Sequence, residues 1–281
     1  MRWLREGDSM KRAFMTTASA AVLALAFGSG AIAAPTYGAP TGWTGQGGDQ
    51  SYGTNTANGV VGEIPGQPAG SSYYFVSTVT GTEGVGSLPG VGGTGEPTNG
   101  ATLTSPLFTA NANEALAFYF NYVTSDGAGY ADYGWARLLN ADGTVAALLF
   151  TARTVPSPGN IVPGTDMPLP EATLSPPVVS ILEGTEWDSL AGDSGACWDS
   201  GCGHSGWVQS SFVITTAGDY RIQFGVTNWD DESFQSGLAF GGVTINDKPI
   251  DPPVGVAEPA TLALLGMGLL GLGAVRRHRA A

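Results

Sequence analysis

Several acidic side chains follow predicted strands, and carboxylate oxygens are ligands that calcium prefers. Asp126 and Asp132 end two segments near one predicted hairpin, and three further acids follow another strand. A calcium ion takes six to eight oxygens from carboxylates, carbonyls and water. We therefore hypothesise a structural calcium site where these loops meet; the alternative is solvated surface charge. The candidate ligands are Asp126, Asp132, Asp230, Asp231 and Glu232.

Tryptophans among small polar residues suggest a second kind of chemistry, the binding of sugars. Trp198, Trp207 and Trp229 stand beside Asp, Asn, Ser and Gly, and a sugar-binding surface needs aromatic rings next to hydrogen-bonding groups. The alternative is that these rings pack in the core or under loops. Two carboxylates would suffice for a glycosidase, but no spacing singles out a pair. We therefore expect no enzymatic activity.

Two other motifs do not amount to a catalytic or zinc site. Gly-Asp-Ser-Gly at 192–195 resembles the nucleophile loop of trypsin-like proteases, in which the histidine precedes the serine, but His204 and His278 both follow it. Cys197, Cys202 and His204 lack a fourth zinc ligand at matching spacing. In an oxidising compartment the two cysteines are expected to form a local disulfide.

The N-terminal residues have the pattern of an export signal. A basic pair, Lys11-Arg12, precedes an apolar run over residues 13–27, and residues 31–33 have the small-x-small form of a signal-peptidase site. We expect signal peptidase to remove residues 1–33. The alternative is a retained N-terminal membrane anchor.

The C-terminal residues 256–281 combine an acidic-proline pair, an apolar segment and an arginine cluster. Residues 260–275 are 16 in number and uncharged, slightly short of the roughly 17 that span a bilayer. Because basic residues stay on the cytoplasmic side, the long N-terminal part is expected outside. The motif residues are Ala257, Glu258, Pro259, Arg276, Arg277 and Arg279.

This tail resembles the PEP-CTERM sorting tail of Gram-negative bacteria that make extracellular polysaccharide. The resemblance implies recognition by an exosortase, a membrane-embedded transpeptidase that reads Pro-Glu-Pro, although Ala257 stands at the first proline. It also implies transient anchoring in the inner membrane and delivery to the cell surface, outer membrane or extracellular matrix. The alternative is a plain C-terminal anchor.

The charge between the two ends excludes one class of partner. Residues 34–255 hold four basic and 21 acidic side chains, a net charge near −17. Such a surface repels phosphate backbones, so we expect no binding of nucleic acid. It suits cations and keeps an exported protein soluble. The length, about 220 residues, suits one domain with a sizeable core.

Alternation of apolar and polar residues predicts short strands between the two ends, without an amphipathic helix. A turn at 140–143 makes a hairpin of its two neighbours, and seven of the 18 prolines predict a surface connection over 154–177. The predicted fold is all-β, a single jelly-roll-like β-sandwich. Strands are expected at 72–80, 103–108, 115–122, 133–139, 145–151, 208–214, 220–229 and 237–245.

These elements divide the chain into a signal peptide, a lead-in, a core, a linker and a tail. The lead-in is rich in Gly, Thr and Ser, and we expect it to hold at least one strand and to be partly flexible. The boundaries are 1–33, 34–100, 101–248, 249–255 and 256–281.

Residues 120–127, 130–133, 224–231 and 236–240 are similar to segments of exported β-sandwich domains found ahead of PEP-CTERM tails, and to carbohydrate-binding jelly rolls. Gly241 and Gly242 stand where the latter often carry an Asp. The sorting tail, the low basic content and the lack of a catalytic set lead us to hypothesise a non-enzymatic structural or adhesive component of the exopolysaccharide or biofilm layer. The alternatives are a calcium-dependent carbohydrate-binding module and a glycan-degrading enzyme.

Overall fold

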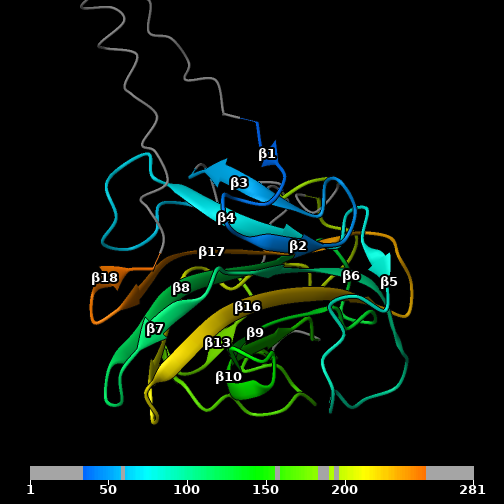
Figure 1. Ribbon diagram of the computed structural model, residues 1–281. Helices are drawn as coiled ribbons and strands as arrows, with labels where there is room; N and C mark the ends of the chain where they lie inside the picture. Colours follow the sequence, from blue (N-terminus) through cyan, green and yellow to red (C-terminus); the bar gives the residue numbers. More distant parts are fainter. Residues whose placement is uncertain (1–33, 58–60, 156–158, 183–189, 193–195, 251–281) are drawn as a thin grey trace, which may run out of the picture. The chain divides into compact units, whose positions relative to one another are not determined.

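A computed structural model describes residues 34–57, 61–155, 159–182, 190–192 and 196–250 (Figure 1). These residues form strands joined by turns and loops, and no helix occurs among them. Accordingly, the described ranges contain no helix long and apolar enough to cross a membrane. The expected signal peptide and sorting tail lie outside the described residues.

Two antiparallel sheets make up the body of the domain. In sheet A the strand order is β1-β3-β4-β17-β8-β15-β12, with β14 beside β8 and β18 beside β17. The bounds are β1 Thr36–Tyr37, β3 Tyr52–Thr56, β4 Ser72–Ser77, β17 Ser236–Ile245, β8 Ala115–Thr124, β15 Val208–Val213, β12 Thr173–Ser175, β14 Gly203–His204 and β18 Lys248–Pro249.

Sheet B has the order β10-β9-β16-β6-β2, with β5 beside β6 and β7 beside β16, and β11 pairs separately with β13. The bounds are β10 Val145–Arg153, β9 Tyr133–Asn140, β16 Gly218–Trp229, β6 Pro97–Thr104, β2 Thr44–Gln46, β5 Thr82–Glu83, β7 Phe108–Ala110, β11 Asn160–Val162 and β13 Val179–Ser180.

The order of the eight principal strands defines the fold. Taken along the chain they are β4, β6, β8, β9, β10, β15, β16 and β17. In sheet A the neighbours are β4, β17, β8 and β15, which are the first, eighth, third and sixth of these strands. In sheet B they are β6, β16, β9 and β10, which are the second, seventh, fourth and fifth. Two nested Greek keys wound in this way make a jelly roll. The predicted all-β sandwich is confirmed.

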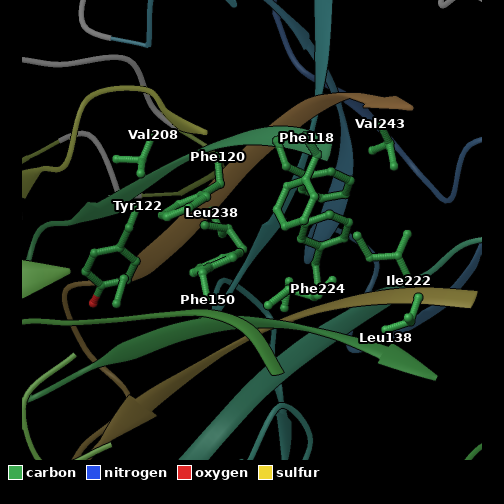
Figure 2. Close-up of a cluster of buried hydrophobic side chains, with 14 of the residues drawn as sticks. Phe118, Phe120, Tyr122, Leu138, Phe150, Val208, Ile222, Phe224, Leu238 and Val243 are labelled. Atoms are coloured by element: carbon green, nitrogen blue, oxygen red, sulfur yellow. The ribbon is translucent and has the colours of Figure 1, made fainter. Parts of the chain in front are cut away.

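Aromatic rings from the two sheets meet in the core (Figure 2). Phe224 of sheet B stacks on Phe240 of sheet A with ring centroids 3.6 Å apart, and Phe120 of sheet A stacks on Phe150 of sheet B at 3.7 Å. Strand alternation turns these side chains inward. Since burying one Phe contributes about 1.5–3 kcal/mol, the cross-sheet pairs hold the layers together.

The predicted hairpin and proline-rich connection are found, and one strand lies elsewhere than expected. β9 and β10 pair antiparallel across the turn after Asn140. The connection over 154–177 contains only three-residue strands among its described residues, and β12 pairs at the edge of sheet A. The strand expected at 103–108 was wrong: β6 ends at Thr104 and β7 begins at Phe108, because Pro106 has no N–H for a ladder.

Residues 34–77 contribute to both sheets. β2 pairs with β6 in sheet B, whereas β3 pairs with β4 in sheet A. Between them Trp43 is buried, with its ring 5.3 Å from Tyr74 and 5.6 Å from Phe240. The glycine- and threonine-rich N-terminal stretch therefore completes the sandwich core.

Candidate functional site

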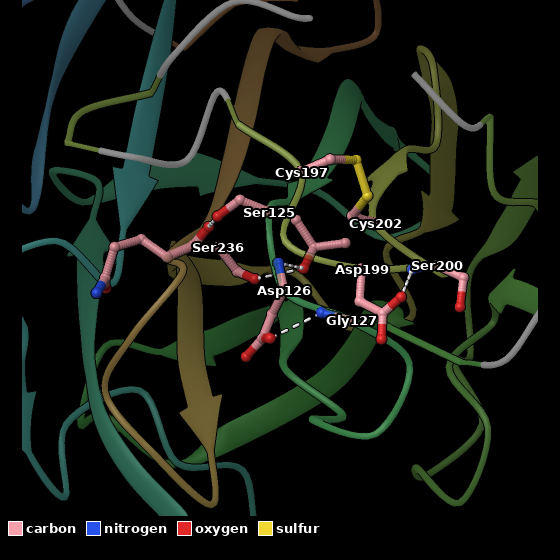
Figure 3. The surroundings of a disulfide bond; sticks show 10 residues. Ser125, Asp126, Gly127, Cys197, Asp199, Ser200, Cys202 and Ser236 are labelled. Carbon is pink, nitrogen blue, oxygen red and sulfur yellow. Dashed lines mark hydrogen bonds between the residues drawn. A yellow bond between two sulfur atoms is a disulfide. The ribbon is translucent and has the colours of Figure 1, made fainter. Parts of the chain in front are cut away.

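Three loops converge at one end of the sandwich, and we refer to them together as the loop end. They are residues 125–132 between β8 and β9, residues 196–202 before β14, and residues 230–235 between β16 and β17. Ser125 joins two of them, since its backbone N–H donates to the carbonyl of Gln235 at 3.2 Å and its hydroxyl donates to the same oxygen at 2.6 Å. Figure 3 shows the surroundings of Ser125.

Asp132 is the carboxylate at the centre of the loop end. Its side chain is fully buried, and its two oxygens accept from different strands. The backbone N–H of Trp229 donates to Oδ1 at 2.8 Å, and the hydroxyl of Ser236 donates to Oδ2 at 2.6 Å. Burial raises the pKa of Asp132 well above its usual value, with a further rise from the charge of Asp126, against the opposing effect of these hydrogen bonds.

The backbone of Asp132 is held as firmly as its side chain. Its carbonyl accepts from the hydroxyl of Tyr122 at 2.7 Å and from the N–H of Thr154 at 2.9 Å. The hydroxyls of Tyr122 and Thr154 lie 2.9 Å apart. Burial raises the pKa of Tyr122, so the phenol stays protonated. Asp132 thus ties β8, β9, β16 and β17 together from inside the domain.

The other predicted calcium ligands do not gather around one point. Asp126 is buried, and its Oδ1 accepts from the N–H of Gly127 at 2.7 Å (Figure 3). Oδ1 of Asp230 accepts from the N–H of Glu96 at 3.2 Å, and Oδ1 of Asp231 accepts from the N–H of Ser233 at 2.8 Å. These oxygens hold turns.

Glu232 is exposed in the same loop as Asp230 and Asp231. In the part of the chain that the structure describes, no group of three or more His, Cys, Asp or Glu lies close enough to hold a metal ion. Calcium binding stays a prediction, and the described geometry adds no ligand set to it.

The disulfide loop is fastened to the loop after β8. Cys197 and Cys202 are bonded, with their Cα atoms 5.6 Å apart (Figure 3). The N–H of Trp198 donates to the carbonyl of Ser125 at 2.8 Å, and the N–H of Ala128 donates to the carbonyl of Ser200 at 2.9 Å. Because the loop is closed by a covalent bond and held by two backbone hydrogen bonds, Trp198 has a fixed position.

Trp198 presents its ring to solvent at the loop end. The side chain is 57% exposed and stacks on Phe234 of the β16–β17 loop, with ring centroids 4.4 Å apart and ring planes at 24°. Phe234 has a φ of 50°, which is uncommon for a bulky residue. A sugar ring can stack on an exposed tryptophan that is backed in this way by a half-buried phenylalanine.

The other two tryptophans predicted to contact a glycan are less exposed than Trp198. Trp229 is 3% exposed; the guanidinium of Arg153 lies 4.5 Å from its centroid, and its Nε1 donates to the carbonyl of Thr94. Trp207 is half-buried, and its Nε1 donates to the carbonyl of Gly62 at 2.8 Å. Trp229 is therefore almost fully covered, whereas Trp207 is partly accessible, and contact of either ring with a glycan stays a prediction.

One aromatic partner was missed by the sequence analysis. Phe234 stands as a single apolar residue within an acidic, polar run between two strands. An isolated aromatic in such a loop was the available signal. Its partner Trp198 lies 36 positions earlier in sequence, so only the fold places the two rings together.

The sequence comparisons identify the C-terminal segment. Residues 256–277 match the family model of the PEP-CTERM protein-sorting motif. This motif implies an exported protein that is sorted to the cell surface and processed by an exosortase. No curated protein matches the chain.

The solved structures that resemble the domain do so distantly. A cleaved adhesin domain of Lys-gingipain from Porphyromonas gingivalis has 11% identity over 76% of this chain and 98% of its own, with a TM-score of 0.32. The enzymatically active domain of tailspike protein 4 from bacteriophage CBA120 has 13% identity over 73% of this chain and 19% of its own, also with a TM-score of 0.32. A family 11 carbohydrate-binding module of a Clostridium thermocellum cellulase has 11% identity over 69% of this chain and 95% of its own, with a TM-score of 0.18. At these TM-scores the likenesses carry no argument about function.

Proposed function

We propose that this exported protein is a non-enzymatic, adhesive component of the extracellular polysaccharide layer, and that it holds a glycan at the loop end. The observation that carries the proposal is the exposed stack of Trp198 on Phe234. The sorting motif at 256–277 supports it, since it delivers the domain to the cell surface, where such polymers lie.

The chemistry of the loop end suits an uncharged sugar chain. The apolar face of a pyranose ring packs on an aromatic ring, and a Trp presents a large, rigid surface for this purpose. Asp199 adjoins Trp198 in the disulfide loop and is exposed, as is Glu232, two positions before Phe234 in the sequence. Carboxylates accept hydrogen bonds from sugar hydroxyls, whereas they repel an anionic polymer.

The buried carboxylate of Asp132 is not placed to act as the general acid of a glycosidase. A raised pKa is what a general acid in a glycosidase needs, and Asp132 has one. Its side chain is 0% exposed, however, and both oxygens are occupied by Trp229 and Ser236. A carboxyl that cannot reach the glycosidic oxygen cannot protonate it, so the raised pKa of Asp132 reflects its structural role.

Retention of the full-length protein in native gels that contain the producing cell's own exopolysaccharide tests the proposal. The Trp198→Ala variant is expected to weaken binding about tenfold, since the loss of one aromatic contact of about 1.4 kcal/mol corresponds to that factor. The Tyr37→Ala variant is the matched control, because Tyr37 is an aromatic residue with 43% exposure outside the loop end. Equal retention of the wild type and the Trp198→Ala variant would contradict the assignment.

Two further arms separate the remaining alternatives. Repeating the gels with chelator tests whether retention depends on calcium, as the calcium-dependent module requires. Incubating the protein with the polysaccharide and assaying reducing ends tests for hydrolysis. Deleting residues 256–281 is expected to change where the protein is delivered, and unchanged surface delivery would remove the premise of a surface role.

A further inference from the structure

The outer face of sheet B carries a row of polar side chains that crosses four strands. Arg137 of β9 lies directly opposite Gln223 of β16, which lies opposite Thr104 of β6, which in turn lies opposite Thr44 of β2. Nε of Arg137 donates to Oε1 of Gln223 at 2.8 Å, and Nε2 of Gln223 donates to Oγ1 of Thr104 at 2.9 Å. These side chains are half-buried or exposed, so the row faces solvent.

The guanidinium of Arg137 is held in place before any ligand arrives. It lies 4.7 Å from the ring centroid of Trp135, the residue two positions earlier on the same face of β9. Gly225 opposite makes room for that ring, which fills the space where a Cβ would stand. Stacking and the Nε hydrogen bond orient the group, while Nη1 and Nη2 donate to no atom of the described residues. Two parallel N–H groups of this kind bind a carboxylate in bidentate fashion.

A second arginine stands diagonally beside the first. Arg221 precedes Gln223 by two residues on β16 and therefore lies on the same face. Diagonal neighbours on paired strands are about 7–8 Å apart. Nη1 of Arg221 donates to the carbonyl of Ser105 at 3.3 Å. Within the described residues neither Arg137 nor Arg221 forms an ion pair, although Asp219 stands two positions before Arg221, where it accepts from Thr109 at 2.6 Å.

This pair contrasts with the charge of the rest of the domain. Residues 34–255 contain four basic side chains against 21 acidic ones, yet two of the four are neighbours on one sheet face. Like charges placed side by side repel each other unless an anion lies between them. Two acids lie near the pair: Asp219 accepts from Thr109, and Glu171 accepts from the N–H of Leu148, which lies opposite Arg137. At physiological salt the Debye length is about 8 Å, so the remaining acids of the domain are largely screened from the two guanidinium groups.

We propose that the outer face of sheet B binds a carboxylate-bearing polysaccharide, with Arg137 and Arg221 each contacting a uronate carboxylate and Gln223 and Thr104 contacting hydroxyls between them. This site is separate from the loop end and does not rest on the function proposed for Trp198. A nucleic acid fits the face poorly: the ring of Trp135 is 1% exposed under Arg137 and offers no surface for a base.

Affinity electrophoresis of the full-length protein in gels containing polygalacturonate tests the proposal, with dextran as the uncharged polymer. We expect retardation by polygalacturonate that weakens as salt is raised and is absent with dextran. The double variant Arg137→Gln, Arg221→Gln is expected to raise the dissociation constant at least about tenfold. Arg137→Lys is expected to raise it about three- to tenfold, because an ammonium keeps the charge but not the bidentate geometry.

Lys248→Gln is the matched control, because it removes one positive charge from an exposed residue of sheet A and is expected to leave retardation unchanged. Urea denaturation midpoints of all variants establish that they are folded. If the double variant does not fold, Arg137→Lys alone tests the proposal. The proposal is overturned if the arginine variants bind as the wild type does, if Lys248→Gln has the same effect as they do, or if double-stranded DNA is retarded as strongly as polygalacturonate. A loss of binding to the producer's polymer in Trp198→Ala with polygalacturonate binding intact shows that the two sites are independent.

Discussion

The backbone N–H of Trp229 donates to the buried carboxylate of Asp132 at 2.8 Å, across 97 positions of sequence. Trp229 ends β16, and Asp132 immediately precedes β9, so this bond fixes the point where two neighbouring strands of sheet B meet the loop end. Through Ser236 the same carboxylate also reaches β17 of sheet A. The hydrogen bonds of Asp132 thereby fix the strand ends next to the loops that carry Trp198 and Phe234.

Removing the carboxylate is expected to destabilise the whole domain. Asp132→Ala leaves the N–H of Trp229 buried without its acceptor, whereas the hydroxyl of Ser236 keeps Thr124 as a partner at 2.9 Å. One unsatisfied buried donor costs about 1–3 kcal/mol, and we expect a loss of about that size in the free energy of unfolding, measured by urea denaturation. Asp132→Asn keeps an oxygen for Trp229 and offers an amide to the oxygen of Ser236, so a loss as large as that of the alanine variant would contradict this reading.

The contribution of Asp132 to the free energy of unfolding is expected to rise as the pH falls through its raised folded pKa towards the usual value of 3.8. The folded pKa of Asp132 lies well above its usual value of 3.8, so the folded state binds a proton that the unfolded state has released. The stabilisation from this proton is fully present below the unfolded pKa and is lost as the pH rises through the folded pKa. The measurement is the difference in the free energy of unfolding between wild type and Asp132→Asn at each pH. A difference that does not change with pH would contradict the prediction.

Opening the disulfide is expected to affect glycan binding more than folding. A ring of six residues restrains the unfolded chain by about 2 kcal/mol, whereas the Cys197–Cys202 bond positions Trp198 directly. For the Cys197→Ser, Cys202→Ser variant we expect retention on the exopolysaccharide to fall severalfold while the domain stays folded. Thermal melts run beside the binding gels separate the two effects, and unchanged retention would show that the loop keeps its form without the bond.

The stacked core rings are expected to dominate stability. Phe240→Ala removes a ring that contacts Phe224, Trp43 and Tyr74, and truncations of buried Phe cost about 3–5 kcal/mol. Val213→Ala is the control, since Val213 is 56% exposed in β15 and its truncation is expected to change stability by less than about 0.5 kcal/mol. Similar urea midpoints for the two variants would contradict the described core.

The calcium hypothesis predicts a rise in the melting temperature when calcium is added in excess. A ligand at a hundred times its dissociation constant stabilises the folded state by about 2.7 kcal/mol, which moves a domain of this size by several degrees. The rise is expected to disappear in the Asp230→Ala, Asp231→Ala variant. Equal melting temperatures in calcium and in chelator would leave these carboxylates as turn-forming groups, as their hydrogen bonds to Glu96 and Ser233 suggest.

Strands whose residues alternate were predictable from the sequence, because period-two burial is a local property. Phe118, Phe120 and Tyr122 alternate with less apolar residues and face the core, as expected. The first part of the sandwich was harder to predict, because Trp43 lies in a stretch dominated by glycine, threonine and serine. The burial of Trp43 depends on contacts with strands far along the chain, which no local pattern records.

The candidate sites were harder to predict than the strands, because their residues come together only in the fold. The acids 230–232 were recognised by composition, but composition does not reveal that side-chain oxygens of Asp230 and Asp231 accept from backbone N–H groups. Trp198 was recognised as a candidate, whereas Phe234 was not, because the contact exists only after two distant loops meet. Arg137 and Arg221 lie 84 positions apart and become neighbours through the pairing of β9 with β16.

The central position of β17 in sheet A has a consequence for how the protein is made. β4 and β8 both pair with β17, so two strands formed from residues 72–124 stay without a shared neighbour until residue 245 has been synthesised. Such distant pairing slows folding and leaves open strand edges in the meantime. A chain that stops before β17 has two unpaired strand edges, on β4 and β8, and no sorting motif. In the intact chain β17 pairs with both strands, and the residues that direct the protein to the surface follow shortly after it. Completion of the fold and access to the sorting machinery are therefore linked by the order of synthesis alone.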